Sequence, residues 1–345
     1  MLLAPSPTAA QAAPAENAAG GAFSPWRISV APMMDWTDRH CRYFHRLLSR
    51  HALLYTEMVT TGALLHGDVP RHLDFDAGEH PVALQLGGSD PQALAQCARL
   101  GERWGYREIN LNCGCPSERV QHGAFGACLM AEPQLVADGV KAMVDAVGIP
   151  VTVKHRIGID QQESYSFMRD FVGTVSEAGC RTFIVHARAA WLKGLSPKEN
   201  RDVPPLRYAL VHQLKRDFPH LVIAINGGIK NDAEVSAHLQ QLDGVMIGRE
   251  AYHNPWWLAS WDRSFFGAAM REISRDSIEA EMVDYMSRAA LQGTPWPSIA
   301  RHMLGLRHGQ PGARVWRQVW SDHRLKALPA HEVSRIANGQ FQAAA

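Results

Sequence analysis

The chain has 345 residues and a formal net charge of +1, with 46% hydrophobic and 20% charged residues. These values are ordinary for a soluble globular protein, and the length is enough for one barrel-sized domain and a smaller second one. They exclude a membrane-spanning protein, because no apolar run approaches the ~18–20 residues needed to cross a bilayer. Six scattered cysteines, with no CxxC pair, favour a reducing compartment and argue against a structural metal site. We therefore expect a cytoplasmic protein without a metal, and we take it to be a monomer.

The first 25 residues differ in composition from the rest of the chain. They are rich in Ala, Pro, Ser and Gly, and no Lys or Arg occurs before Arg27. A signal peptide needs a basic start and a longer apolar core. We therefore predict that residues 1–25 form a disordered tail.

Eight short apolar runs follow, and segments with helical spacing lie between most of them. Strands that alternate with helices pair in parallel, and eight such units predict a closed (β/α)8 barrel, here over residues 26–267. The predicted strands are 28–31, 53–56, 82–86, 109–112, 151–154, 183–186, 222–226 and 244–248. The clearest predicted helices are 91–104, 133–147, 165–177 and 232–241.

Many of the predicted strands end on a polar residue or a glycine. In a barrel of this type the carboxyl ends of all strands meet at one rim, where catalytic residues lie. We therefore expect the functional side chains to gather at that rim. The residues at these ends are Glu57, Gln85, Asn112, Lys154, His186, Asn226 and Gly248.

Three of the strand ends suit a flat cofactor. The first strand is followed by Pro32, Met33 and Met34, and a flexible thioether can lie against the face of a planar ring. Gln85 can both donate and accept a hydrogen bond, as the pyrimidine edge of a flavin requires, and Lys154 could stabilise negative charge on that edge. Each residue alone is equally compatible with packing or with solvent. Together they indicate a flat, anionic, phosphorylated cofactor.

The fourth predicted strand ends in Asn112-Cys113-Gly114-Cys115-Pro116, which must leave the strand and form a loop at the rim. A thiol held there is a candidate acid or nucleophile, whereas a buried structural cysteine is the commoner fate of this residue type. Residues i and i+2 of a strand share a face, so the spacing alone leaves both Cys113 and Cys115 open.

The last two predicted strands end on glycines. Asn226-Gly227-Gly228 closes the seventh strand, and Gly248-Arg249 closes the eighth. Glycines let backbone N–H groups approach a phosphate, and an arginine adds a charge-assisted contact. A lone Gly-Gly is usually only a turn, but a phosphate site in the loops after strands 7 and 8 recurs in these barrels. Two glycine sites at successive strand ends therefore favour phosphate binding.

After Gly267 the pattern becomes helical, with Ser277 as the predicted cap of a helix. We predict a small all-helical domain over residues 268–345. From Arg301 onward the chain has seven basic and two acidic residues, so this segment carries a net charge of +5 and the rest of the chain −4. Such a basic segment fits a polyanionic partner as well as it fits a solvated helical face.

These motifs together resemble the tRNA dihydrouridine synthases, and specifically the A subfamily of the bacterial enzymes. The resemblance covers residues 26–320 in the order of the family, and the joint occurrence of the motifs is highly specific. The motifs that carry it are Ala31-Pro32-Met33-Met34-Asp35-Trp36-Thr37-Asp38, Glu57-Met58-Val59-Thr60-Thr61-Gly62, Gln85-Leu86-Gly87-Gly88, Asn112-Cys113-Gly114-Cys115-Pro116-Ser117, His186-Ala187-Arg188, Asn226-Gly227-Gly228-Ile229 and Gly248-Arg249.

The resemblance implies an FMN-binding barrel followed by a helical tRNA-binding domain. It further implies an enzyme that NADPH reduces (NADH is possible) and that then reduces the C5–C6 bond of uridines 20 and 20a in the tRNA D-loop. By similarity, FMN would contact Pro32, Met33, Met34, Gln85, Lys154, His186, Asn226, Gly227, Gly228, Gly248 and Arg249. By similarity, tRNA would contact Lys198, Arg201, Arg314 and Arg317, with Asn112 near the substrate base.

In this reaction a hydride adds at C6, because the C5–C6 bond is conjugated to the C4 carbonyl, and C5 then needs a proton. A thiol has an ordinary pKa of about 8.5, so it is mostly protonated at neutral pH and can donate that proton. Register with the Gly-Cys-Pro-Ser motif of the family identifies Cys115 as the acid. Cys113 and His155 depart from the family pattern, and we interpret His155 as a solvated or packing histidine.

Two alternatives stay open. A flavin barrel that reduces a free pyrimidine or a small enone would not need the basic helical domain. A tRNA-binding protein that has lost its chemistry would not need Cys115, Lys154 or the glycine sites. Arg314 and Arg317, with Trp316 between them, suit contact with RNA phosphates or base planes if they lie on a helix, but the simpler interpretation of the tryptophans is a packed core.

Overall fold

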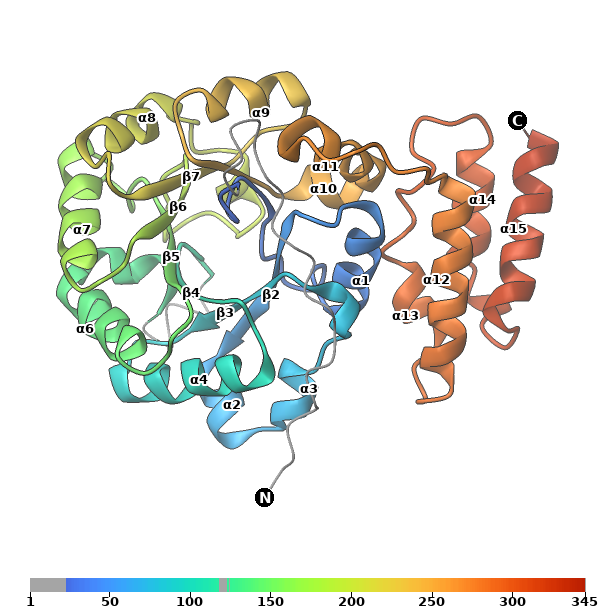
Figure 1. The fold of residues 1–345 in the computed structure, drawn as a ribbon, viewed down its shortest axis with the longest axis horizontal. Coiled ribbons are helices and arrows are strands. Elements are labelled where there is room, and N and C mark those ends of the chain that lie inside the picture. Colours follow the sequence, from blue (N-terminus) through green and yellow to red (C-terminus); the bar gives the residue numbers. More distant parts are fainter. Residues whose placement is uncertain (1–22, 118–122, 124, 345) are drawn as a thin grey trace.

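The computed structural model describes residues 23–117, 123 and 125–344, so most of the predicted tail lies outside the described residues. Eight parallel strands form a closed barrel in chain order, which confirms the predicted (β/α)8 fold (Figure 1). The strands are β1 Ile28–Val30, β2 Leu53–Thr60, β3 Val82–Gly87, β4 Glu108–Cys113, β5 Val151–Arg156, β6 Thr182–His186, β7 Val222–Asn226 and β8 Gly244–Ile247.

Helices surround the barrel on the outside (Figure 1). Their ends follow local chemistry: in the helix from Pro91 to Trp104, Asp90 caps the first turn and Gly105 ends it in a left-handed conformation. The helices of this part are α1 Arg39–Leu48, α2 Thr61–His66, α3 Val69–Leu73, α4 Pro91–Trp104, α6 Pro133–Val144, α7 Tyr165–Glu177, α8 Tyr208–Asp217, α9 Asp232–Leu239, α10 Arg249–His253 and α11 Leu258–Phe266. Among the described residues, no helix is long and apolar enough to cross a membrane.

One strand is longer than its apolar run suggested. β2 continues through Glu57 to Thr60, and its register against β3 shifts between Tyr55 and Met58. The shift is a bulge, which absorbs an extra residue and turns side chains to the other face. Glu57, which we predicted at the end of this strand, therefore lies within it.

The interior of the barrel is partly polar. A small apolar cluster lies inside it, and a much larger one lies between the strands and the helices. On β4, Glu108, Asn110 and Asn112 make side-chain hydrogen bonds to residues of the neighbouring strands β3 and β5. The alternate residues Ile109, Leu111 and Cys113 pack in the larger cluster. The apolar members of the inner cluster are Ala31, Leu53, Tyr55, Ala83, Ile184, Ala224 and Met246.

Four further helices form a bundle beside the barrel (Figure 1). The first begins one turn earlier than predicted, because Ser274 is its N-cap and Ser277 is the third residue of a reciprocal capping box. The division at residue 267 stays our prediction; it falls in the segment between α11 and this helix. The helices are α12 Arg275–Ala290, α13 Trp296–Ala300, α14 Ala313–Trp320 and α15 Ala330–Ala344.

Candidate active site at the barrel rim

Strand register brings several of the predicted site residues side by side. Asn112 at the end of β4 is opposite Lys154 on β5, and His186 at the end of β6 is opposite Asn226 on β7. Lys154 Nζ donates to Asn226 Oδ1 at 3.3 Å, across the intervening strand. Side chains from the fourth to the seventh strand therefore share one end of the barrel.

The two candidate thiols have different environments. Cys113 is the last residue of β4 and is fully buried against the helices, and this burial raises its pKa well above the ordinary value. Cys115 is only partly buried in the loop that follows. Its backbone N–H donates to Asn112 Oδ1 at 3.0 Å, and its carbonyl accepts from Ala127 N–H at 2.9 Å. Because β4 ends at Cys113, Cys115 no longer follows the alternation of the strand, and the two thiols that the spacing left open have different surroundings.

Lys154 is a partly buried cation of the rim. Burial and the positive charge of Arg156 together lower its pKa to about 7, and a negative charge on Cys115 would act in the opposite direction. The pKa of His186 is lowered well below its usual range by burial, with contributions from Arg156 and Lys154. A lysine with a pKa near neutrality, close to a thiol, is typical of a site that handles protons.

Arg156 is a residue near the rim that the sequence reasoning did not name. It is buried, and its guanidinium donates to the carbonyl oxygens of Gly114 at 3.0 Å, Ala189 at 3.0 Å and Asn200 at 2.8 Å. It therefore ties the Cys115 loop to the loop after β6. The signal was present, because Arg156 follows Lys154 by two residues on β5 and so faces the same side.

The glycines after β7 have the backbone that only glycine adopts readily. Gly227 and Gly228 have φ of +118° and +74°. A methyl group on Gly227 would come within 2.7 Å of the His186 ring, and one on Gly228 within 2.6 Å of Leu206. At Gly248 a methyl group would meet no atom within 4 Å, so the backbone there faces open space.

Comparison with known proteins is decisive for the family. The family model described as "Dihydrouridine synthase (Dus)" matches residues 29–340. A tRNA-dihydrouridine(20/20a) synthase of Escherichia coli (strain K12) is 63% identical over 302 residues, which cover 87% of this chain and 87% of that relative. A protein of the same name from Pseudomonas syringae pv. tomato is 64% identical over 295 residues, covering 86% and 88%.

The chain belongs to the dihydrouridine synthase family. The resemblance inferred from the motifs is thereby confirmed, and the chain is an enzyme of this family. A solved complex of 2-naphthoyl-CoA reductase with 2-naphthoyl-CoA superposes with a TM-score of 0.53 at 12% identity. The match covers 68% of this chain and 49% of that chain, and at this identity it supports the fold alone.

The remaining predicted residues of this family member lie on two separate elements. Lys198 caps a short 3-10 helix, η3 Glu199–Arg201, in the loop after β6. Arg201 is close to the rim, because the charges of Arg249 and Cys115 act on it. Burial and the positive charge of Arg249 lower its pKa, whereas a negative charge on Cys115 raises it. Arg249 at the start of α10 forms an ion pair with Asp202 at 2.6 Å.

The two bundle arginines that the resemblance assigns to tRNA lie on α14. Arg314 and Arg317 are exposed, whereas Trp316 and Trp320 are fully buried. The packing interpretation of these tryptophans is therefore correct, and they are not available to stack on RNA. Among the described residues, no group of three His, Cys, Asp or Glu side chains could hold a metal ion, and the absence of a metal stays a prediction.

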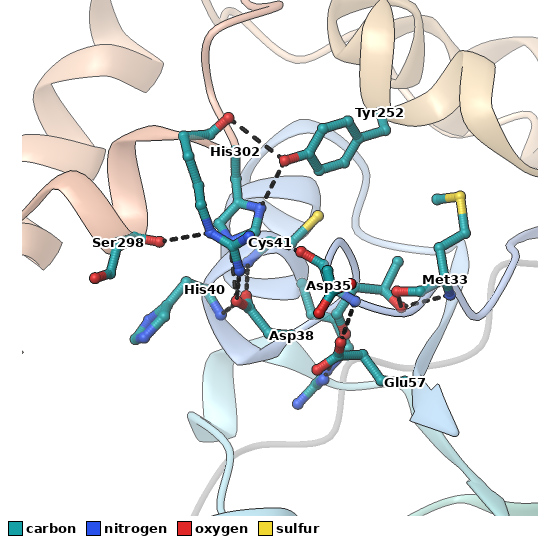
Figure 2. Close-up of polar contacts among 12 residues, drawn as sticks. Met33, Asp35, Asp38, His40, Cys41, Glu57, Tyr252, Ser298 and His302 are labelled. Atoms are coloured by element: carbon teal, nitrogen blue, oxygen red, sulfur yellow. Dashed lines mark hydrogen bonds and ion pairs between the residues drawn. The ribbon is translucent and has the colours of Figure 1, made fainter. Parts of the chain in front are cut away.

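The helical bundle touches the barrel at the start of α1, where sequence reasoning had placed no function (Figure 2). Asp38 Oδ1 caps α1 by accepting from the backbone N–H groups of His40 and Cys41 at 3.0 Å. Asp38 Oδ2 accepts from Arg301 Nη2 at 2.6 Å and lies 3.0 Å from His302 Nε2. Burial raises the pKa of Asp38, but the hydrogen bond and charge of His302 hold it well below its usual range.

The same contact reaches the loop that carries the predicted cofactor residues Pro32, Met33 and Met34. Arg301 Nη1 donates to the carbonyl oxygen of Asp35 at 2.7 Å (Figure 2). Asp35 has a φ of +64°, and its N–H donates to Glu57 Oε1 at 2.5 Å. We call the Asp35–Asp38–Arg301–His302 contact the interdomain clasp. It holds loop 31–38 between β2 and the bundle.

Proposed function

We propose that this chain is an FMN-dependent, NADPH-reduced tRNA dihydrouridine synthase. Its substrates would be uridines 20 and 20a of the tRNA D-loop, and the product would carry a saturated C5–C6 bond. The high identity to proteins named for this reaction supports the proposal. A cytoplasmic location is part of it, because a bacterial tRNA is met there.

The observation that carries the proposal is the environment of Cys115. It is a partly exposed thiol at the mouth of the barrel, close enough to Lys154, Arg156 and Arg201 for its charge to act on their pKa values. A proton donor beside a cluster of cations fits an anionic cofactor and a polyanionic substrate.

The residues of the rim fit FMN. Gly227, Gly228 and Gly248 provide a backbone on which no side chain would block a phosphate, and at Gly248 the adjoining space is open. Lys154 is partly buried, and among the described residues its ammonium makes one hydrogen bond, the long one to Asn226. Its other donors are therefore available for an anionic ring edge.

Each residue then has a defined task. FMN, when bound and reduced, supplies the hydride that adds at C6. Cys115 donates its Sγ proton to C5, and Asn112 holds its loop by accepting the Gly114 and Cys115 N–H groups. Asn112 retains one N–H, since its other one donates to Gln85, so it can still contact the base.

The substrate base lies within a folded RNA, so it must leave its stack to reach the barrel. Lys198 and Arg201 at the rim and Arg314 and Arg317 on the bundle would bind RNA phosphates on either side of it. The bundle would therefore serve to bind RNA, which an enzyme acting on a small free pyrimidine would not need.

The test combines purified protein, FMN, NADPH and tRNA transcribed without modifications, with dihydrouridine measured by nucleoside mass spectrometry. The proposal predicts dihydrouridine at positions 20 and 20a after mapping of the product. A yellow protein that yields no dihydrouridine would favour a small-molecule reductase. A colourless protein that binds tRNA would favour a binding function without chemistry.

A further inference from the structure

A chain of side-chain hydrogen bonds descends from the Cys115 loop into the barrel. Cys115 N–H donates to Asn112 Oδ1 at 3.0 Å, and Asn112 Nδ2 donates to Gln85 Oε1 at 2.9 Å. Gln85 Nε2 in turn donates to Asn110 Oδ1 at 2.7 Å. Each of these three side chains is buried. The amides therefore link the rim to the layer below it.

The chain continues to the opposite end of β4. Asn110 Nδ2 donates to Thr152 Oγ1 at 2.7 Å, and Thr152 Oγ1 donates to Glu108 Oε1 at 2.5 Å. Glu108 also accepts from Tyr55 Oη at 2.8 Å and from Trp26 Nε1 at 2.6 Å. The carboxylate is thus held by three neutral donors. We call the path from Glu108 to Cys115 the interior chain.

The groups at the two ends of the interior chain both require its hydrogen bonds to be donated in one direction, from Cys115 toward Glu108. The N–H of Cys115 can only donate, so Asn112 must turn its oxygen toward the loop. Above its pKa of about 7, the carboxylate of Glu108 can only accept, so Thr152 must donate to it. With the ends fixed, each amide between them has one satisfactory orientation.

An ionised carboxylate is energetically unfavourable at this position. Glu108 is fully buried, its described hydrogen-bond partners are all neutral, and burial raises its pKa to about 7. An uncompensated buried charge is strongly unfavourable, and an apolar residue would fill the volume without that cost. What the carboxylate adds is a terminus that only accepts hydrogen bonds.

We propose that Glu108 is a positioning residue, which acts through the interior chain to fix the amide orientations of Gln85 and Asn112 and the geometry of the Cys115 loop. This inference rests on the proposed function, in which Gln85 contacts the cofactor and Cys115 is the acid. Gln85 keeps one N–H and one oxygen lone pair beyond the chain. Their positions follow from the orientation that Glu108 imposes from the far end of the strand.

Two substitutions at the same carboxylate test the inference. Thr152→Val and Tyr55→Phe each remove one hydroxyl donor from Glu108, but only Thr152 lies on the interior chain. The first readout is the rate at which iodoacetamide alkylates Cys115 in flavin-free protein, followed by peptide mass spectrometry. The second is kcat and KM for unmodified tRNA.

We expect Thr152→Val to change the alkylation rate of Cys115 about threefold or more and to lower kcat about tenfold, because small misplacements of reacting groups are costly. The KM for tRNA should stay close to that of the unaltered protein. Tyr55→Phe should leave the alkylation rate and kcat unchanged. Glu108→Gln, which keeps the volume but can donate as well as accept, should reproduce the effect of Thr152→Val.

Equal behaviour of Thr152→Val and Tyr55→Phe in both readouts would overturn the inference, because the chain would then serve only to support the barrel. If Thr152→Val does not fold, Glu108→Gln against Tyr55→Phe decides the question in the same way. If the unaltered protein forms no dihydrouridine, the proposed function fails, and the alkylation rates still decide whether Glu108 positions the loop.

Discussion

Two buried glutamates organise the two parts of this molecule in different ways. In the barrel, Glu108 accepts from neutral donors only, and one of them begins the chain that leads to the rim. In the bundle, Glu279 accepts from Arg307 at 2.9 Å as well as from Trp316 and Trp320. Both carboxylates are almost completely buried.

The difference lies in what each carboxylate holds together. Glu279 on α12 also accepts from Ser334 and Asn338 on α15, so with α14 it joins three helices around one ion pair. A paired charge of this kind stabilises the packing of the helices, and the hydrogen bonds of Glu279 stay within the bundle. Glu108 has no cation partner among the described residues, and its hydrogen bonds extend toward the candidate chemistry. The bundle uses its glutamate for assembly and the barrel uses its own for orientation.

The largest expected effect lies at the rim end of the interior chain. Cys115→Ala should bind FMN with an unchanged absorption spectrum yet lose about 10²–10⁴-fold in dihydrouridine formation, because it lacks the proton donor. Cys113→Ala is the matched control, since Cys113 is buried two residues earlier and should keep most of the activity. The reverse pattern would assign the acid to Cys113.

The next largest effect tests whether Glu279 holds the helices of the bundle together. Glu279→Ala should lower the free energy of unfolding by about 3 kcal/mol, because it removes the buried partner of Arg307 and leaves only its ion pair with the exposed Asp276. Urea unfolding followed by tryptophan fluorescence measures this, since Trp316 and Trp320 pack on Glu279. Glu281→Ala, at an exposed position of the same helix, should have almost no effect. Equal losses would contradict the assembly role.

The pH dependence of stability tests the neutral surroundings of Glu108. The pKa of Glu108 is about 7 in the folded protein, against an ordinary value of 4.5. Below pH 4.5 both states hold the proton; as pH rises from 4.5 to 7 the unfolded state ionises first, so stability falls, by up to about 3 kcal/mol.

Glu108→Gln should remove this loss. The difference in unfolding free energy between the unaltered protein and the variant should therefore change between pH 4.5 and pH 7 and stay constant above that range. This difference is the quantity to measure, because other buried groups such as Glu79 titrate in the same range and cancel from it. Parallel curves for the two proteins would show that Glu108 does not retain its proton on folding.

A smaller effect concerns RNA binding by the bundle. Arg317→Ala should weaken tRNA binding and reduce the slope of log affinity against log salt by about 1, because one phosphate contact is lost. Affinities measured over a range of salt concentrations test this. Arg335→Ala, at an exposed position on α15, is the control and should leave the slope unaltered. An equal reduction by both would indicate only a general effect of charge.

The smallest effect is at the interdomain clasp. Arg301→Ala should cost about 1 kcal/mol or less, because its ion pair with Asp38 is partly exposed. Hydrogen exchange should nevertheless become faster in loop 31–38, where Arg301 holds the Asp35 carbonyl. Arg324→Ala removes an ion pair to Asp322 within the bundle and should leave that loop unchanged. Unchanged exchange in both variants would exclude a role for the clasp in ordering the loop.

The sequence correctly predicted which side chains meet at one end of the barrel, because strand ends fix their place, whereas their roles stay predictions. Lys154, His186 and Asn226 lie together because parallel strands in a closed barrel bring their carboxyl ends to one rim. The prediction did not name Arg156, whose partners are three backbone carbonyls in loops far apart in the chain. The spacing of the strand places Arg156 on the same side as Lys154, but no residue pattern specifies which backbone carbonyls it contacts. Ser277 was misjudged as a cap for a local reason, since Ser274 and Ser277 share a capping box.

The amino-acid sequence by itself determined the order of strands and helices, the polar strand ends and the motif that holds Cys115, because periodicity and turn chemistry are local properties of the chain. Only the tertiary structure decided that Cys113 faces the helices, that Trp316 and Trp320 belong to a core, and that Glu108 is connected to the rim. These outcomes depend on strand register and barrel closure, which decide the groups that satisfy one another across the interior.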